Sequence, residues 1–180
     1  MPSQTMTDSR YIGRFAPTPS GFLHFGSLVA ALASWLDARA ANGRWLLRME
    51  DTDPPREMPG ARDAILQTLE RYGLEWDGEV VFHSQRHDAY AAVVDRLFSM
   101  GLAYARTCPR KQLEGYDGVY PGFCRNAGHA REGAAIRLRV PELIDRFGDR
   151  VQGPFEQHLG REVGDFVIQR RDGLYAYQLA

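Results

Sequence analysis

The chain has 180 residues, 44% hydrophobic and 25% charged, with a formal net charge of −1. This length suits one domain, or one domain with an insertion, and the balanced charge excludes a strongly basic nucleic-acid binder while leaving a local basic face open. No apolar run reaches the roughly 18–20 residues that span a bilayer. Residues 1–10 lack the apolar core of a signal peptide, so we expect them to form a flexible tail. Two cysteines and no export signal predict a cytoplasmic protein.

The first fifty residues have the pattern of a strand, a helix and a second strand. Residues 11–16 are strand-like, residues 26–42 are helical and residues 44–49 form a compact apolar run. Apolar side chains recur in the helix at helical spacing, at Leu28, Leu32, Trp35 and Leu36. This unit predicts two parallel strands joined by a right-handed crossover, and therefore an open α/β sheet.

Further helices and strands are predicted in the rest of the chain. Helical spacing covers residues 61–72, with an apolar stripe at Ile65, Leu69 and Tyr72, and also residues 86–100. Residues 104–131 have no clear period and are rich in Gly, Arg, Tyr and Pro, which indicates an insertion. Strands are expected at residues 134–140, 166–168 and 174–177.

The loop before the first helix has the features of a nucleotide triphosphate site. Proline and glycine make the segment from Thr18 to Gly21 rigid, and His24 and Gly26 follow at the start of the helix. Unpaired N–H groups and partial positive charge at a helix N-terminus favour phosphate. His24 can donate a hydrogen bond to phosphate oxygens, and Gly26 lets a ligand approach the backbone. We expect Ser27 to cap the helix or to contact phosphate.

Two segments far apart in sequence should meet at one edge of the sheet. In open α/β sheets, ligands bind beyond the carboxyl ends of the strands, where Arg14 and Glu50 both lie. A guanidinium group can pair bidentately with a substrate carboxylate, and Glu50 can accept a substrate ammonium group. The alternatives are a solvent-exposed arginine and a capping or surface acid. Asp51 or Asp53 is expected to cap the next segment, with no proton-transfer role.

These segments together resemble the class I aminoacyl-tRNA synthetases, in their glutamyl branch. His24-Phe-Gly-Ser27 stands where that class carries its HIGH signature, with serine replacing the last histidine. Residues 14–21, 50–53 and 165–173 are glutamyl-type segments, and the resemblance runs from Tyr11 to the last residue. The His-Phe-Gly-Ser form and residues 50–57 and 170–180 are most similar to members that modify tRNA(Asp).

The resemblance implies an enzyme that activates glutamate with ATP and Mg²⁺ and transfers it from glutamyl-adenylate to the queuosine base in the anticodon of tRNA(Asp). The alternative is the N-terminal part of a synthetase that charges the 3′ end of tRNA(Glu). Another nucleotidyltransferase of similar fold and a non-catalytic RNA-binding remnant are further alternatives. The fold implied is the first half of a class I Rossmann-type parallel sheet with an inserted acceptor-binding-like subdomain, in a monomer. The expected division is a tail at 1–10, a catalytic half at 11–103, an insertion at 104–165 and a return to the catalytic domain at 166–180.

The resemblance also implies roles for single residues. His24 is the catalytic residue, which stabilises charge on the α-phosphate during attack by glutamate, without a covalent enzyme intermediate. The implied ATP-binding residues are Pro17, Gly21, His24, Gly26 and Ser27. The implied glutamate-binding residues are Arg14, Phe15, Ala16, Pro17, Thr18, Glu50 and Tyr177. For Tyr177, core packing is the alternative. Seven arginines between Arg137 and Arg171 give the second half a cationic bias that suits tRNA phosphates.

Cys108, Tyr120 and Cys124 fall where this resemblance places a structural Zn²⁺ ion. A closed tetrahedral zinc site needs four ligands, whereas the family pattern begins with Cys-x-Cys and Arg106 stands in its first position here. His129 or water can supply the missing ligand, or the site is lost. In the last case the two cysteines are small apolar residues.

The sequence also predicts that this chain is the N-terminal part of a longer enzyme. Class I synthetases clamp ATP phosphates with a Lys-containing loop, but the single lysine here is Lys111, inside the expected insertion. We therefore expect the 180 residues alone to be inactive, or nearly so, in adenylate formation. Glutamate-dependent ATP–pyrophosphate exchange by this chain and by a longer one tests this prediction, and strong exchange by the short form would contradict it.

Overall fold

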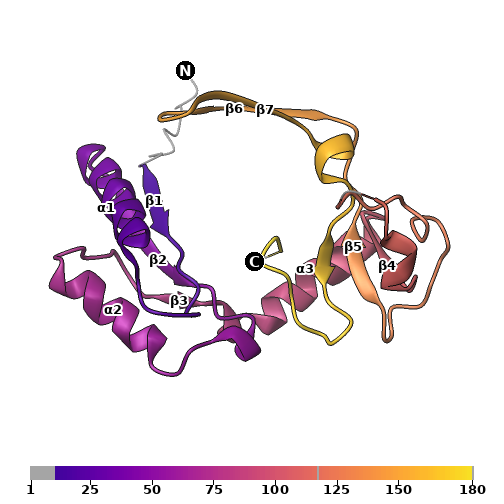
Figure 1. The fold of residues 1–180 in the computed structure, drawn as a ribbon, viewed down its shortest axis with the longest axis horizontal. Coiled ribbons are helices and arrows are strands. Elements are labelled where there is room, and N and C mark those ends of the chain that lie inside the picture. The colour runs from indigo at the N-terminus through magenta and orange to yellow at the C-terminus, as the bar shows by residue number, and fades with distance from the viewer. Residues whose placement is uncertain (1–10, 117, 180) are drawn as a thin grey trace, which may run out of the picture. The chain divides into compact units, whose positions relative to one another are not determined.

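The computed structural model describes residues 11–116 and 118–179 (Figure 1). The chain divides into two compact units, the first ending at Arg86 and the second beginning at His87. The expected tail at residues 1–10 lies outside the described residues.

A parallel three-stranded sheet forms the centre of the first unit. Its strands are β1 (Ile12–Phe15), β2 (Arg44–Met49) and β3 (Val81–Phe82), in that order. Helix α1 (Phe25–Ala40) connects β1 to β2, and helix α2 (Ala61–Arg71) lies between β2 and β3. Figure 1 shows α1 alongside β1. The predicted strand–helix–strand unit and its parallel pairing are thus confirmed.

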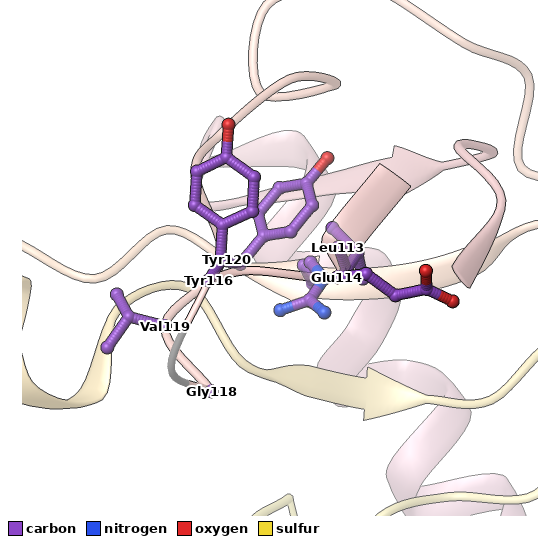
Figure 2. Close-up of a pocket in the computed structure, with 7 residues that line it drawn as sticks. Leu113, Glu114, Tyr116, Gly118, Val119 and Tyr120 are labelled. Atoms are coloured by element: carbon purple, nitrogen blue, oxygen red, sulfur yellow. The ribbon is translucent and has the colours of Figure 1, made fainter. Parts of the chain in front are cut away.

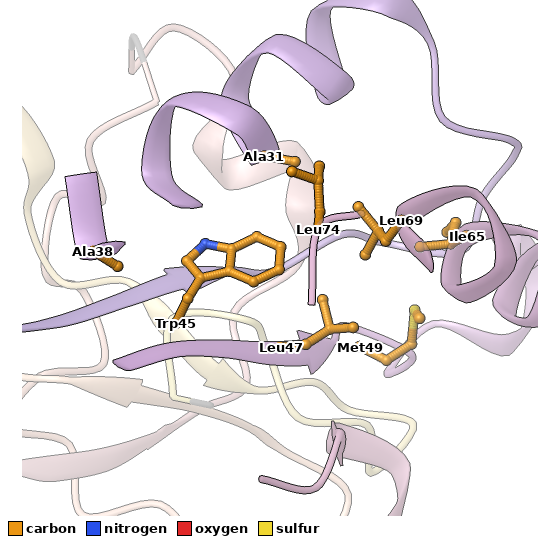
Figure 3. Close-up of a cluster of buried hydrophobic side chains, with 8 residues drawn as sticks. All are labelled: Ala31, Ala38, Trp45, Leu47, Met49, Ile65, Leu69 and Leu74. Carbon is orange, nitrogen blue, oxygen red and sulfur yellow. The ribbon is translucent and has the colours of Figure 1, made fainter. Parts of the chain in front are cut away.

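One face of β2 supplies the core of this unit. Trp45, Leu47 and Met49 are each at most 1% exposed, because alternate residues of a strand share a face. Ile65 and Leu69 of α2 pack into the same cluster, as Figure 3 shows. The stripe predicted for α2 is therefore correct at these two positions. Its third member, Tyr72, is 66% exposed, so that part of the prediction is wrong.

Helix α1 packs through its small residues, which differs from the prediction. Ala31 and Ala38 are fully buried, whereas Leu32 and Leu36 of the expected stripe are 45% and 52% exposed. The reason is the close approach of α1 to β1, since a Cβ atom added at Gly13 would lie 3.2 Å from that of Ala38. Only small side chains fit between backbones at this separation.

The second unit begins with helix α3 (His87–Ser99) and contains an antiparallel sheet. Its strands are, in order, β4 (Ala103–Arg106), β5 (Ala135–Leu138) and β8 (Val167–Gln169). These elements confirm the helix predicted at 86–100 and the strands predicted near 134–140 and 166–168. The strand expected at 174–177 is wrong, because that segment makes only an isolated bridge between Gln169 and Tyr175.

A hairpin made of β6 (Ile144–Asp149) and β7 (Gly153–His158) was not among the elements expected from the sequence. Every residue of β6 is exposed, so the strand has no alternation of apolar and polar residues that would reveal it. The rings of Phe147 and Phe155 pair across the two strands with centroids 5.0 Å apart. Short single-turn helices complete the chain: η1 (Pro54–Arg56), η2 (His83–Gln85), η3 (Arg110–Leu113) and η4 (Leu159–Val163).

Among the described residues, none of the helices combines the length and the apolar composition needed to cross a membrane.

Candidate nucleotide and amino-acid site

The loop after β1 lies directly against the segment after β2. The backbone N–H of Glu50 donates to the carbonyl oxygen of Pro17 at 2.9 Å, and that of Met58 donates to Pro19 at 2.9 Å. Both prolines are buried, whereas Thr18 between them is exposed. The two segments predicted to meet at the carboxyl edge of the sheet are therefore in contact, through their backbones.

The carboxylate of Glu50 already has a cationic neighbour. Arg48 Nη2 lies 2.8 Å from Glu50 Oε1, and the two side chains are 19% and 22% exposed. Within the described residues, only Oε1 of this carboxylate takes part in an ion pair. The sequence predicts a role for Glu50 but not for Arg48. The available signal for Arg48 is its place two residues before the acid on an extended chain, which puts both side chains on one face.

A buried histidine, His83, lies among the charged groups at this edge. It is 1% exposed and follows β3, so the parallel register of β2 and β3 places it beside Glu50. Burial lowers the pKa of His83, and the positive charge of Arg48 adds to this effect. Glu50 and Asp51 raise the same pKa, and Arg14 lowers it further. The imidazole is therefore neutral at pH 7, and the charges of Arg14 and Glu50 both act on it.

Asp51 joins the segment after β2 to the segment after β3. It is 1% exposed and accepts hydrogen bonds from Ser84 N at 2.9 Å and from Ser84 Oγ at 2.6 Å. Arg62 Nη2 lies 3.2 Å from the same carboxylate. Asp53 instead pairs at 2.5 Å with the exposed Arg56 and, at the N-cap of η1, makes no capping bond with its side chain. The expected acidic cap is thus wrong for η1, and Asp51 has a structural role.

His24 is the N-cap residue of α1. Its Nδ1 accepts a hydrogen bond from the backbone N–H of Ser27 at 3.3 Å, and its Nε2 lies 3.1 Å from Ser27 Oγ. The prediction that Ser27 caps the helix is therefore wrong, because Ser27 donates to the cap. A Cβ atom added at Gly26 would lie 3.1 Å from Cε1 of His24, closer than side chains normally pack. The glycine thus leaves room for the imidazole ring over the first turn.

The other residues implied for this site range from partly buried against the core to exposed, and one of them belongs to the second unit. Phe15 stacks on Trp45 with ring centroids 6.2 Å apart, and so packs against the core. Arg14 is exposed, while Ala16 and Gly21 are half-buried. Tyr177 belongs to the second unit, where it lies in a turn and is 67% exposed.

In the second unit, Cys108, Tyr120 and Cys124 form a buried cluster together with Tyr104. Tyr120 also lines a pocket of about 320 Å³ beside Tyr116 (Figure 2). Burial acts to raise the pKa of the Cys124 thiol, but hydrogen bonds from Tyr120 and from the backbone outweigh this effect and lower it to about 6. The three residues implied as metal ligands therefore do come together.

This cluster does not fit the closed zinc site that the resemblance implied. Its possible metal ligands are two cysteine sulfurs and one phenol oxygen, and Arg106 Nε donates a hydrogen bond to Cys108 Sγ at 3.2 Å. Within residues 11–116 and 118–179, no group of three His, Cys, Asp or Glu side chains is arranged to hold a metal ion. His129 consequently does not join the two cysteines as a third such ligand, and a tetrahedral set of four is not reached.

A parallel sheet with connecting helices, and polar loops that meet at its carboxyl edge, is the arrangement of a nucleotide-binding α/β catalytic domain. Residues 12–119 match the catalytic-domain model of the class I tRNA synthetases (E and Q), and the chain belongs to this family. A solved structure of a glutamate tRNA ligase from Elizabethkingia meningosepticum, in complex with its amino acid, has a TM-score of 0.80 and 26% identity. That match covers 94% of this chain and 40% of the ligase, and it confirms the predicted class I fold.

Two curated relatives of much higher identity carry the same name, glutamyl-Q tRNA(Asp) synthetase. The glutamyl-Q tRNA(Asp) synthetase of Pseudomonas entomophila (strain L48) is 94% identical over 175 residues, which are 97% of this chain and 59% of the relative. That of Pseudomonas aeruginosa (strain PAO1) is 77% identical over 172 residues, which are 96% of this chain and 59% of the relative. The chain thus spans about 59% of the length of these relatives.

Replacing Asp51 with alanine should destabilise the first unit, because Ser84 loses the acceptor of two hydrogen bonds. We expect the free energy of unfolding to fall by about 2–3 kcal/mol, in the range for buried bonds to a charged group. The matched control is Asp53→Ala, which removes the ion pair with the exposed Arg56 and should cost about 1 kcal/mol or less. Urea unfolding at pH 7 measures both values, and equal losses would contradict the structural role of Asp51.

Proposed function

We propose that the protein containing this chain activates glutamate with ATP and transfers it to the queuosine base in the anticodon of tRNA(Asp), in the cytoplasm. The observation that carries this proposal is the 94% identity, over 97% of the chain, to a relative named glutamyl-Q tRNA(Asp) synthetase. The alternative, charging of tRNA(Glu), has weaker support. The glutamate tRNA ligase from Elizabethkingia meningosepticum is only 26% identical to the chain over the matched residues.

Recognition of glutamate is assigned to the edge of the sheet where Arg14 and Glu50 lie. The guanidinium of Arg14 is exposed and suits a substrate carboxylate, and Glu50 accepts the substrate ammonium group. Arg48 holds Glu50 by one carboxylate oxygen, which orients the group for its second partner. Neutral His83 adds no positive charge that would repel the ammonium group. We assign the wall of this pocket to Ala16, Pro17 and Thr18. The glutamate-binding roles implied for Phe15 and Tyr177 stay predictions, because Phe15 packs against the core and Tyr177 belongs to the second unit.

ATP is assigned to the loop after β1 and the first turn of α1. Gly26 and Ser27 lie in that turn, and Pro17 and Gly21 shape the loop. A phosphate can take the backbone N–H of Ser27 once it displaces the His24 ring, which accepts that N–H in the free chain. When bound, Mg²⁺ neutralises phosphate charge. An oxygen of the glutamate α-carboxylate attacks the α-phosphorus, the new P–O bond forms and pyrophosphate leaves. His24 stabilises the charge that develops on the α-phosphate, so catalysis is positioning and electrostatics. The queuosine base then attacks the activated carbonyl carbon and AMP leaves.

Variants at the sheet edge should separate the two substrates. In a chain extended to the full length of the relatives, Arg14→Ala and Glu50→Gln should raise the KM for glutamate in ATP–pyrophosphate exchange by roughly 30-fold or more. The KM for ATP should stay nearly constant, because neither side chain contacts phosphate. His24→Asn keeps a capping side chain and should lower kcat with little change in the KM for glutamate. Equal effects of all three variants on both substrates would contradict these assignments.

The tRNA acceptor decides between the two functions. The extended enzyme should transfer labelled glutamate to tRNA(Asp) that carries queuosine, and not to the same tRNA without queuosine. Removal of the 3′-terminal adenosine from tRNA(Asp) should leave the transfer unchanged, since that end is not the acceptor. Labelling of the 3′ end of tRNA(Glu) would overturn the proposal in favour of the alternative.

A further inference from the structure

The cluster of Cys108, Tyr120 and Cys124 is closed by hydrogen bonds within the protein. Cys108 and Cys124 are 8% and 4% exposed, and Tyr120 is 6% exposed. The Tyr120 hydroxyl lies 3.4 Å from Cys108 Sγ and accepts a hydrogen bond from Cys124 N at 2.9 Å. Arg106 Nε donates to Cys108 Sγ at 3.2 Å, so the sulfur already has a cationic partner.

Positive charge near this cluster opposes a divalent cation. The guanidinium carbon of Arg137 lies over the ring of Tyr120, 4.0 Å from the ring centroid. The hydroxyl of this same tyrosine would have to serve as a zinc ligand. Together with Arg106, Arg137 places two guanidinium groups around the two thiols and the phenol. Repulsion between like charges is weakly screened in a buried environment, so a zinc ion here would be opposed by both.

Arg106 also cannot act as a metal ligand. A guanidinium group has N–H donors only and no lone pair to offer, and it stays charged at any pH at which proteins fold. Residue 106 is the last residue of β4, and its side chain extends to the sulfur of Cys108. The position that faces the sulfur is thus occupied by a guanidinium group, which supplies a positive charge and a hydrogen bond to Cys108 Sγ where a metal ion would supply a positive charge and a coordination bond.

We propose that Arg106 replaces a metal ion at this site. Its guanidinium group closes the cluster of Cys108, Tyr120 and Cys124, and the chain folds there without zinc. The identity of residue 106 then decides whether a guanidinium group or a zinc ion closes the cluster. A cysteine at this position would remove one positive charge and add a third thiol, which with the phenol completes a set of four ligands.

Zinc content and thermal stability of the purified chain test this proposal. After incubation with excess Zn²⁺ and gel filtration, the wild type should retain substoichiometric zinc, and EDTA should leave its Tm unchanged. Arg106→Cys should retain about one zinc ion per chain, with a Tm that falls in EDTA. Arg106→Met, which offers neither donors nor charge, should retain no zinc and unfold at a lower temperature than the wild type. Arg96→Met, at an exposed position of α3, controls for the lost charge and should leave Tm unchanged.

Three results would overturn the proposal. The first is stoichiometric zinc in the wild type. The second is an Arg106→Met variant that unfolds at the wild-type temperature, because the guanidinium group would then not close the cluster. The third is an Arg106→Cys variant that folds and takes up no zinc. If Arg106→Cys fails to fold, the wild-type zinc content and the Tm of Arg106→Met still decide the question.

Discussion

The parallel register of β1, β2 and β3 is the constraint on which the candidate site depends. Trp45, Leu47 and Met49 must all face the core, which sets the parity of β2 and allows no slip by one residue. Residues of the opposite parity, Arg48 and Glu50, consequently share the other face. The same register places the ends of β1 and β3 on either side of the end of β2, so that Arg14, Arg48 and Glu50 all act on the pKa of His83. The hydrophobic core therefore determines which polar groups meet.

Three neighbouring acidic residues in one short segment have three different environments. Glu50 keeps an ion pair through one oxygen, Asp51 is buried and binds Ser84, and Asp53 pairs with the exposed Arg56. The buried carboxylate fixes the backbone from which Glu50 projects. The acid that suits a substrate and the acid that holds the segment are thus adjacent in sequence, and a charge count alone does not separate them.

Much of the first unit could be predicted because its pattern is local. The apolar periods and the Gly- and Pro-rich loop indicated the parallel strands and the contact between residues 14–21 and 50–53. The buried face of α1 could not be predicted, because it depends on how closely the helix approaches Gly13 of the neighbouring strand. Arg48 and His83 were missed for a similar reason, since their roles follow from neighbours across the sheet. The β6–β7 hairpin buries no side chain of β6, so it left no periodic signal.

The capping of α1 by His24 has a consequence for any anion that arrives at that helix. The imidazole accepts the N–H of Ser27, which is one of the groups that a helix N-terminus offers to an incoming phosphate. A ligand that takes this N–H must first displace the ring, whose room for movement is given by the bare backbone of Gly26. The ring and the anion therefore compete for one N–H donor. The observed free energy of anion binding is then the free energy of the anion's own contacts minus that of the hydrogen bond lost between His24 and Ser27.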